Sequence, residues 1–257
     1  MLQHSRINIV VAAHKPYWMP TDAMYTPVQV GAFNSEPIQG FQPDNVGENI
    51  SEKNPRYCEL TALYWAWKNS NADYIGLVHY RRHFAGKGDK GTLVLSEAEE
   101  LLARSDVVLP KKRNYYIETV GAHYAHTFDQ THLEVVKKAL KRYSPQMIDA
   151  FEKHLNEKTG HIWNMAIMQR NILDEWCDWL FTILNYVEQL IDFKDMTPFE
   201  ARVMGRLSER LIDPWLDFYG IEYIECPVRP IEKTNWIKKG KGFIESKMLG
   251  KKYSESF

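Results

Sequence analysis

The sequence predicts an α/β fold in which a Rossmann-like, mostly parallel sheet is followed by a helical C-terminal half. Two short apolar runs rich in β-branched residues carry this prediction, at 7–13 (INIVVAA) and 74–80 (YIGLVHY). Unbroken runs of this length are typical of parallel strands buried on both faces. Helical segments alternate with strands up to about residue 120, as a Rossmann-like arrangement requires.

Length and composition set the class of protein. The chain has 257 residues, 44% of them hydrophobic, with 32 Lys+Arg against 33 Asp+Glu. This balance is typical of a globular enzyme or binding module and argues against nucleic acid as the main partner. Cys58, Cys177 and Cys226 are far apart, which favours a reduced, cytoplasmic setting. No apolar run approaches the roughly 18 residues of a membrane span, and no signal peptide is predicted.

The first half is expected to alternate strands, loops and helices. After the strand at 7–13, the segment 17–54 is rich in proline and glycine and predicts a long loop. A helix is predicted over 59–69, ahead of the strand at 74–80. Ser96, with Glu99 three residues later, is expected to cap a helix over 96–103. A third strand is expected at 106–110.

The second half reads as mainly helical, with one short apolar segment, 162–168, that could add a strand. Helices are expected over the following ranges: 131–143, 146–156, 171–191 and 197–218. We expect one domain over 1–237, with a Rossmann-like half at 1–120 and a mainly helical half at 121–237. The lysine-rich segment 238–257 is expected to be a solvated tail.

Polar residues follow both confident strands. His14 and Lys15 come after the first strand, and His79, Arg81 and Arg82 end the second. Ligands of open α/β sheets bind outside the carboxyl ends of the strands, and paired guanidinium groups match phosphate oxygens. We expect a phosphate or diphosphate there. The alternative for the arginines is that they alternate in direction, with one in the cleft and the other in a surface ion pair. The alternative for His14 and Lys15 is a solvated pair at the end of the strand.

A second cationic group is expected on the last long helix. Arg202, Arg206 and Arg210 are spaced by four, which would place them on one stripe with Glu209 beside Arg206. Such a stripe could face a second anionic group, or it could be a solvated helix face braced by ion pairs. Gly205 inside this helix indicates close approach by another backbone or by a ligand.

The histidines do not predict a metal site. His79 and His83 are four apart and His123 and His126 three apart, without a carboxylate in a ligand pattern such as H-E-x-x-H. No Asp-x-Asp sequence occurs, which removes the usual carboxylate pair for a divalent ion on a diphosphate. Fixed cations can neutralise a leaving diphosphate in its place.

Several blocks of this sequence resemble a known family. They are AHKPYWMPTDAMYTPVQVGA, PDNVGENISEKNPRYCELTALYWAWKN, DYIGLVHYRRHF, IWNMAIMQRNILDEWCDWLF and ARVMGRLSERL. They are similar to bacterial capsular and exopolysaccharide glycosyltransferases long classified as a domain of unknown function, some of which are galactofuranosyltransferases. The resemblance extends to about Arg210 and implies a GT-A-like fold, a nucleotide-sugar donor and a glycan or lipid-linked acceptor. HYRR stands where most GT-A enzymes have Asp-x-Asp, so we expect metal independence.

The resemblance also implies roles for residues, and Arg81 and Arg82 are expected to contact the diphosphate. Asn164 and Met165 would line the sugar or acceptor side, and Arg202 and Arg210 would close the site. The residues expected to border the nucleotide, or to shape the loop of the donor site, are His14, Lys15, Asn49, Ser51, Asn54, Glu59 and His79.

The expected activity is transfer of a hexose, with galactofuranose as one option, from a UDP-sugar to a hydroxyl group. Glu209 is the first choice for the base and Asp129 the reserve, with Arg81 and Arg82 stabilising the leaving UDP. No cofactor besides the donor is expected. The alternatives are a non-catalytic nucleotide- or glycan-binding module and a histidine-dependent metallohydrolase. The basic tail could bring the protein to the inner face of the cell membrane.

Overall fold

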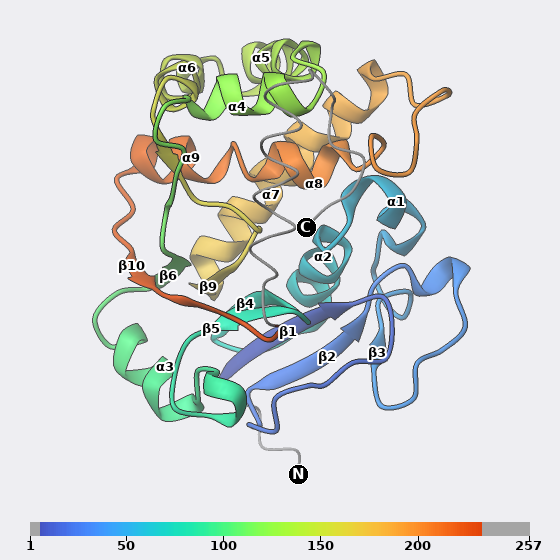
Figure 1. Cartoon of the computed structure of the whole chain (residues 1–257), viewed down its shortest axis with the longest axis vertical. Helices are drawn as coiled ribbons and strands as arrows, with labels where there is room; N and C mark the ends of the chain where they lie inside the picture. Colours follow the sequence, from blue (N-terminus) through green and yellow to red (C-terminus); the bar gives the residue numbers. More distant parts are fainter. Residues whose placement is uncertain (1–5, 233–257) are drawn as a thin grey trace.

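A computed structural model describes residues 6–232, and a mostly parallel sheet runs through its centre (Figure 1). Across the sheet the strand order is β10, β6, β9, β4, β1, β2, β3. The strands span, in chain order, β1 Ile7–Ala13, β2 Tyr25–Gln29, β3 Gln42–Pro43, β4 Tyr74–His79, β6 Val107–Pro110, β9 Ala166–Gln169 and β10 Ile224–Cys226. The pairs β1–β2, β1–β4, β2–β3 and β6–β10 are parallel, whereas β9 is antiparallel to both β4 and β6.

The apolar sequence of β1 follows from burial on both faces. Ile9 and Val11 pack into the core on one side of the sheet, and Val10 and Ala12 pack into the core on the other. All four are at most 4% exposed. At roughly 25 cal/mol per Å² of apolar surface removed from water, such a strand is stable only between two covered faces.

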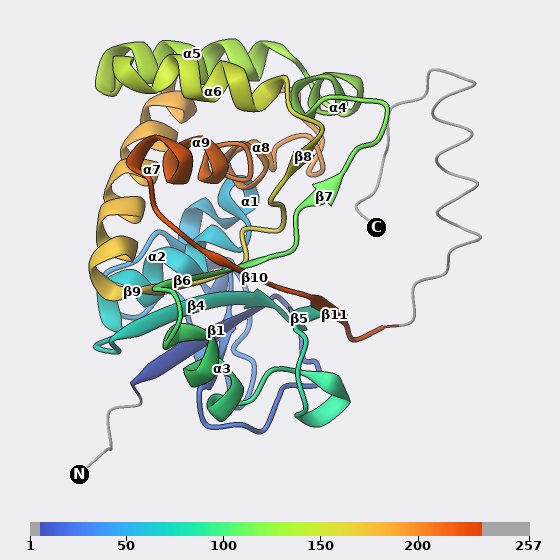
Figure 2. The same ribbon diagram turned by 90° about the vertical axis from the view of Figure 1, so that its left-hand side faces the viewer.

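Helices cover the two faces unequally (Figure 2). Helices α2 and α7 lie against one face with α8 and α9 above them and α4, α5 and α6 outermost, whereas α3 covers the other face. The helices span α1 Asn54–Tyr57, α2 Leu60–Asn69, α3 Leu95–Leu102, α4 Val120–Thr127, α5 Thr131–Tyr143, α6 Ile148–Leu155, α7 Arg170–Leu190, α8 Val203–Ser208 and α9 Ile212–Tyr219. The strand predictions at 7–13, 74–80 and 106–110 and the helix predictions at 59–69, 131–143, 146–156 and 171–191 are confirmed within a few residues at each end.

Two small pairings lie at the carboxyl end of the sheet. Strand β5 (Arg82–Phe84) turns back antiparallel to β4 and pairs with β11 (Val228–Pro230). Strands β7 (Arg113–Asn114) and β8 (Thr159–Gly160) pair with each other in a separate ribbon. The segment 121–237 therefore supplies helices and also strands β8 to β11.

The segment 17–54, predicted as a long loop, also contains two short strands, β2 and β3. Pro27 lies inside β2, opposite Val11 of β1. Strand β3 pairs only with Val28 and Gln29, so most of β2 is an edge strand, where proline is tolerated. The expected cap at Ser96 is wrong. Helix α3 begins at Leu95, and Glu97 accepts a hydrogen bond from the Val94 N–H at 3.3 Å.

The predicted helix over 197–218 is two helices, α8 and α9, separated by a turn. Pro214 explains the break, because a proline lacks an N–H and cannot sit in the interior of a helix without losing a hydrogen bond. Helix α9 begins at Ile212, which places Pro214 in its first turn, where no intrahelical partner is needed. Among residues 6–232, no helix combines the length and apolarity needed to cross a membrane.

We expect the stability of the protein to fall as His83 is protonated. His83 is fully buried beside the rings of Trp18 and Tyr25, and burial, aided by the charge of His79, lowers its pKa to about 4. Because this pKa lies below that of the unfolded chain, the stabilisation is complete above about pH 6.5 and is lost as the pH falls toward 4. A difference of this size corresponds to roughly 3 kcal/mol.

Urea unfolding at pH 7 and pH 4.5 measures this loss. His83→Phe keeps a ring but cannot be protonated, so it should flatten the difference between the two pH values relative to the wild type. The control Tyr143→Phe changes an exposed aromatic side chain and should leave the difference unchanged. An unaltered pH dependence in His83→Phe would contradict the assignment.

Candidate functional site

Cationic side chains meet at the edge of the sheet where β1 and β4 end. The chain leaves β1 into His14 and Lys15 and leaves β4 into Tyr80 and Arg81. The buried Tyr80 ring is their common neighbour. It lies 5.3 Å from the His14 ring, 5.8 Å from Lys15 Nζ and 5.2 Å from the Arg81 guanidinium carbon.

Arg82 and Arg202 complete this group of cations. The Arg82 guanidinium lies 5.5 Å from the centre of the Trp163 ring, and burial, followed by the charge of Arg81, lowers its pKa. Arg202 Nε contacts Cys58 Sγ at 3.1 Å. Burial lowers the pKa of His14, and the charges of Lys15, Arg81 and Arg202 lower it further. We call Lys15, Arg81, Arg82 and Arg202 the cation cluster, and the His14 imidazole lies beside it.

Beside the cation cluster, the turn at residues 161–164 (HIWN) holds several polar groups together. Asn164 Nδ2 donates to Glu59 Oε1 at 2.6 Å and to the Gly205 carbonyl at 2.8 Å. The Trp163 carbonyl contacts His79 Nε2, which lies 3.9 Å from Glu59 Oε1. Glu59, His79 and Asn164, which lie far apart in the sequence, therefore meet in one place.

Glu209 and Arg210 brace the same turn from the segment between α8 and α9. The Trp163 N–H donates to Glu209 Oε1 at 2.9 Å, and Arg210 Nη1 lies 2.5 Å from Glu209 Oε2. Arg210 is only 4% exposed. Both oxygens of Glu209 are therefore engaged, one by a backbone N–H and one by a buried cation.

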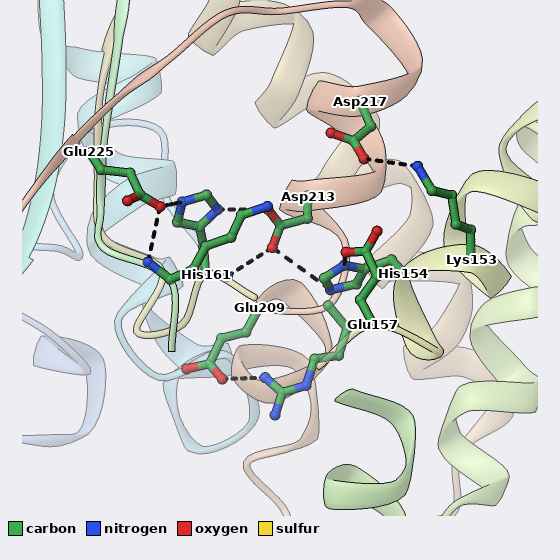
Figure 3. A network of polar contacts seen from close by, with 10 residues as sticks. Lys153, His154, Glu157, His161, Glu209, Asp213, Asp217 and Glu225 are labelled. Carbon is green, nitrogen blue, oxygen red and sulfur yellow. Dashed lines mark hydrogen bonds and ion pairs between the residues drawn. The ribbon is translucent and has the colours of Figure 1, made fainter. Parts of the chain in front are cut away.

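A buried network centred on Asp213 anchors the start of the turn (Figure 3). Asp213 Oδ1 lies 2.7 Å from His161 Nδ1 and 3.0 Å from Lys112 Nζ, and Oδ2 accepts from the His161 N–H at 2.8 Å. Glu225 Oε1 lies 3.4 Å from His161 Nε2. Burial alone would raise the pKa of Asp213, but the hydrogen bond and charge of His161, with His154 and Lys112, hold it well below its usual range. This network ties α9 to β10 through the turn.

Other residues singled out in the sequence lie in local roles. Asn49 Nδ2 donates a hydrogen bond to the Gly47 carbonyl at 2.8 Å, and Asn54 Nδ2 donates one to the Cys58 carbonyl at 2.8 Å. Both residues therefore shape the segment before α2. Ser51 is buried, donates to Asp44 and accepts from the Phe33 N–H. Asp129 is exposed and accepts from the Thr131 N–H at 2.8 Å at the start of α5. Met165 is buried in the core instead of facing the site.

The expected arginine stripe does not exist. Arg202 precedes α8, Arg206 lies within it, and Arg210 lies in the turn that follows, so the spacing of four does not align them. The Arg206 guanidinium instead packs against Phe128 and Phe199, at 3.8 and 4.2 Å from the ring centres. Burial lowers the pKa of Arg206 to about 10.

Gly205 confirms the close approach that the sequence indicates. A Cβ there would lie 3.3 Å from the Tyr57 carbonyl oxygen and 3.3 Å from Cys58 Cβ. Only a glycine lets α8 approach the segment that leads into Glu59 so closely.

The side chains at this edge do not fit a divalent metal. The nearest groups are mainly guanidinium and ammonium, which repel a cation, whereas Mg²⁺ and Ca²⁺ require several oxygen ligands. No cluster of three His, Cys, Asp or Glu side chains suited to a metal occurs within residues 6–232. His123 and His126 both contact the Glu118 carboxylate, at 3.1 and 3.2 Å, which accounts for their spacing.

Tyr80 and Trp163 are the site residues that the sequence did not reveal. Tyr80 lies within the HYRR sequence, whose arginines drew attention away from the ring between them and β4. Trp163 has a left-handed backbone (φ 75°), which no sequence pattern signals. The one signal in the sequence for Trp163 was its position directly before Asn164.

The fold of this chain is similar to that of a known protein. Among solved structures, the chain is similar to the apo structure of WbbM, a bifunctional glycosyltransferase, with 27% sequence identity and a TM-score of 0.78. The match covers 88% of this chain and 45% of that one, so this chain spans less than half of WbbM. The predicted α/β fold of GT-A-like type is confirmed. No curated protein sequence matches the chain.

A family model extends over most of the chain. The model described as Domain of unknown function (DUF4422) matches residues 8–219, a range that includes the cation cluster, Glu59 and the 161–164 turn. The chain therefore belongs to the DUF4422 family.

Proposed function

We propose that this protein is a glycosyltransferase that uses a nucleotide-sugar donor. The observation that carries the proposal is the cation cluster at the ends of β1 and β4, in a fold shared with a structure named as a glycosyltransferase. Ligands of α/β sheets bind at this edge, and clustered guanidinium groups suit a diphosphate. Arg81 and Arg82 would stabilise the charge that builds on the leaving diphosphate.

The finer proposal follows from the sequence resemblance. We put UDP-sugars first as donors, with UDP-galactofuranose first among them, and a glycan or lipid-linked acceptor of capsular or exopolysaccharide synthesis. This would make the protein a hexosyltransferase. Calorimetric titration with UDP, followed by a panel of nucleotide sugars scored for slow donor hydrolysis, tests both levels. Binding of UDP without transfer or hydrolysis of any donor would instead favour a non-catalytic binding module.

We expect the reaction to need no divalent metal, because the fixed charges of the cation cluster could balance a leaving diphosphate in place of a metal. EDTA should leave the rate of UDP release unchanged, and added Mn²⁺ should not raise it. Dialysis against EDTA followed by rate measurement with and without Mn²⁺ checks this. Loss of activity in EDTA with full recovery in Mn²⁺ would contradict metal independence, and stoichiometric zinc in the purified protein would favour a metallohydrolase.

The setting of the enzyme is also a proposal. All three cysteines are unpaired, as expected for a reduced, cytoplasmic environment. The basic tail at 238–257 lies outside the described residues. Its contact with an anionic membrane stays a prediction, at roughly 1 kcal/mol per basic residue near the surface.

A further inference from the structure

We propose that Glu59 is the catalytic base of this site. The inference rests on the proposed function, since it names the group that would take the proton from the acceptor hydroxyl. A base needs a carboxylate oxygen free to reach that proton, on a side chain held in one orientation. The acidic side chains near the cation cluster differ in this respect.

Glu209, the carboxylate favoured from the sequence, is committed to structure. Its two oxygens are bound by the Trp163 N–H and by Arg210. To act as a base it would have to release Arg210, which is 4% exposed and would be left as a buried, unpaired cation. Breaking such a pair is strongly destabilising, because it leaves a buried charge without compensation. Asp129, the reserve, is an exposed residue whose Oδ1 accepts from the Thr131 N–H at 2.8 Å just before α5.

Glu59 has the required geometry. Oε1 accepts from Asn164 Nδ2 at 2.6 Å and lies 3.9 Å from His79 Nε2. Oε2 makes no hydrogen bond or ion pair with the described residues. The side chain as a whole is 12% exposed. One oxygen is thus fixed while the other is available to a substrate.

The backbone around Glu59 supports an active role. Cys58, which precedes it, and Trp163 and Asn164, which face it, have φ angles of 53°, 75° and 54°. A positive φ is unfavourable in residues other than glycine, and such residues concentrate at functional sites. Two separate segments therefore adopt unfavourable conformations where they meet at one carboxylate.

Glu59 also lies at the cation cluster. Its charge is among those that raise the pKa of Arg202 and that oppose the lowering of the pKa of Arg82. A donor whose diphosphate lies on these guanidinium groups would therefore bring its sugar close to this carboxylate.

The chemical step balances within the site. The acceptor hydroxyl oxygen forms a bond to the anomeric carbon while the bond from that carbon to the diphosphate oxygen breaks. The electron pair of the broken bond leaves with UDP, whose charge the arginines stabilise. The Glu59 carboxylate takes the hydroxyl proton and returns it to solvent after the product leaves.

Kinetics of Glu59→Gln separate a base from a binding residue. General-base assistance typically contributes about 10²–10⁴-fold, so kcat should fall by that factor while the KM for the donor changes only a few-fold. Glu52→Gln, a change at an exposed carboxylate seven positions earlier, should behave as wild type. A kcat of Glu59→Gln within threefold of wild type, or a loss confined to KM, would overturn the assignment.

Rescue by azide gives a readout that a structural role would not move. Azide is an anionic nucleophile that needs no proton removed, so it should raise UDP release by Glu59→Ala well above the rate without azide. It should not raise release by the wild type or by Asn164→Ala. Absence of rescue in a Glu59→Ala protein that still binds UDP would refute the role as base. A wild-type protein that binds no UDP would contradict the proposed function itself.

Discussion

Arg82→Ala should lower turnover of the nucleotide-sugar donor by about 10²–10³-fold, the usual cost of losing one well-placed charge stabiliser. The Arg82 guanidinium lies 5.5 Å from the centre of the Trp163 ring, and burial, followed by the charge of Arg81, lowers its pKa, so the substitution removes a cation held at one place in the site. Arg81→Ala should cause a loss of the same kind. Steady-state rates of UDP release at saturating donor measure both effects.

Two further variants make this test specific. Arg82→Lys keeps the charge but loses the planar fork that binds two phosphate oxygens, so it should recover only part of the rate. Arg104→Ala removes an exposed arginine after α3 and should keep wild-type turnover. Near-normal turnover by Arg82→Ala, with an unchanged melting temperature, would remove the role given to the cation cluster.

Asp213→Ala should destabilise the protein by about 3–5 kcal/mol, because it leaves Lys112 and His161 facing each other in the interior without their shared carboxylate. Asp213 is 1% exposed, so water cannot replace the lost oxygens. For a chain of this size each kcal/mol lowers the melting temperature by roughly 2–4 °C. Thermal unfolding followed by circular dichroism should therefore show a loss of roughly 10 °C.

Asp217 supplies the matched control on the same helix (Figure 3). It lies 3.9 Å from Lys153 in an exposed pair, with side-chain exposures of 46% and 71%. Surface pairs of this kind contribute at most about 1 kcal/mol, so Asp217→Ala should shift the melting temperature by only a few degrees. Equal shifts in the two variants would show that the Asp213 network does not stabilise the fold as its burial indicates.

The sequence predicted the parts of this structure that depend on local patterns. Continuous apolar runs revealed β1 and β4, and the polar residues that follow them correctly marked the edge of the sheet where His14 and Arg81 meet. The fold class followed from the alternation of strands and helices. These features share a cause, since burial on both faces of a parallel sheet leaves a direct trace in the order of residues.

The predictions that failed concern features that depend on contacts between residues distant in the sequence or on a single overlooked signal. Pro214 was a visible sign that the range 197–218 is not one helix. The spacing of the arginines gave no sign that α8 begins only at Val203 and ends at Ser208, before Arg210. The pairing of Glu59 with Asn164 joins residues 105 positions apart and left no periodic trace. Contacts of this kind decide which carboxylates are already engaged in ion pairs. The sequence could therefore suggest Glu209 as a base but could not reveal that Glu209 forms an ion pair with Arg210.

The pairing of β5 with β11 determines how far the chain must extend beyond the family match to support Arg81 and Arg82. Pro230 lies opposite Arg82, the Ile231 N–H donates to the Arg81 carbonyl at 3.0 Å, and Tyr17 donates to Glu232 at 2.7 Å. Pro230, Ile231 and Glu232, which make these contacts, come after residue 219, where the family match ends. A fragment trimmed to the matched range would keep both arginines but lose the strand that aligns them, so any shortened form intended to stay active should retain residues up to at least 232.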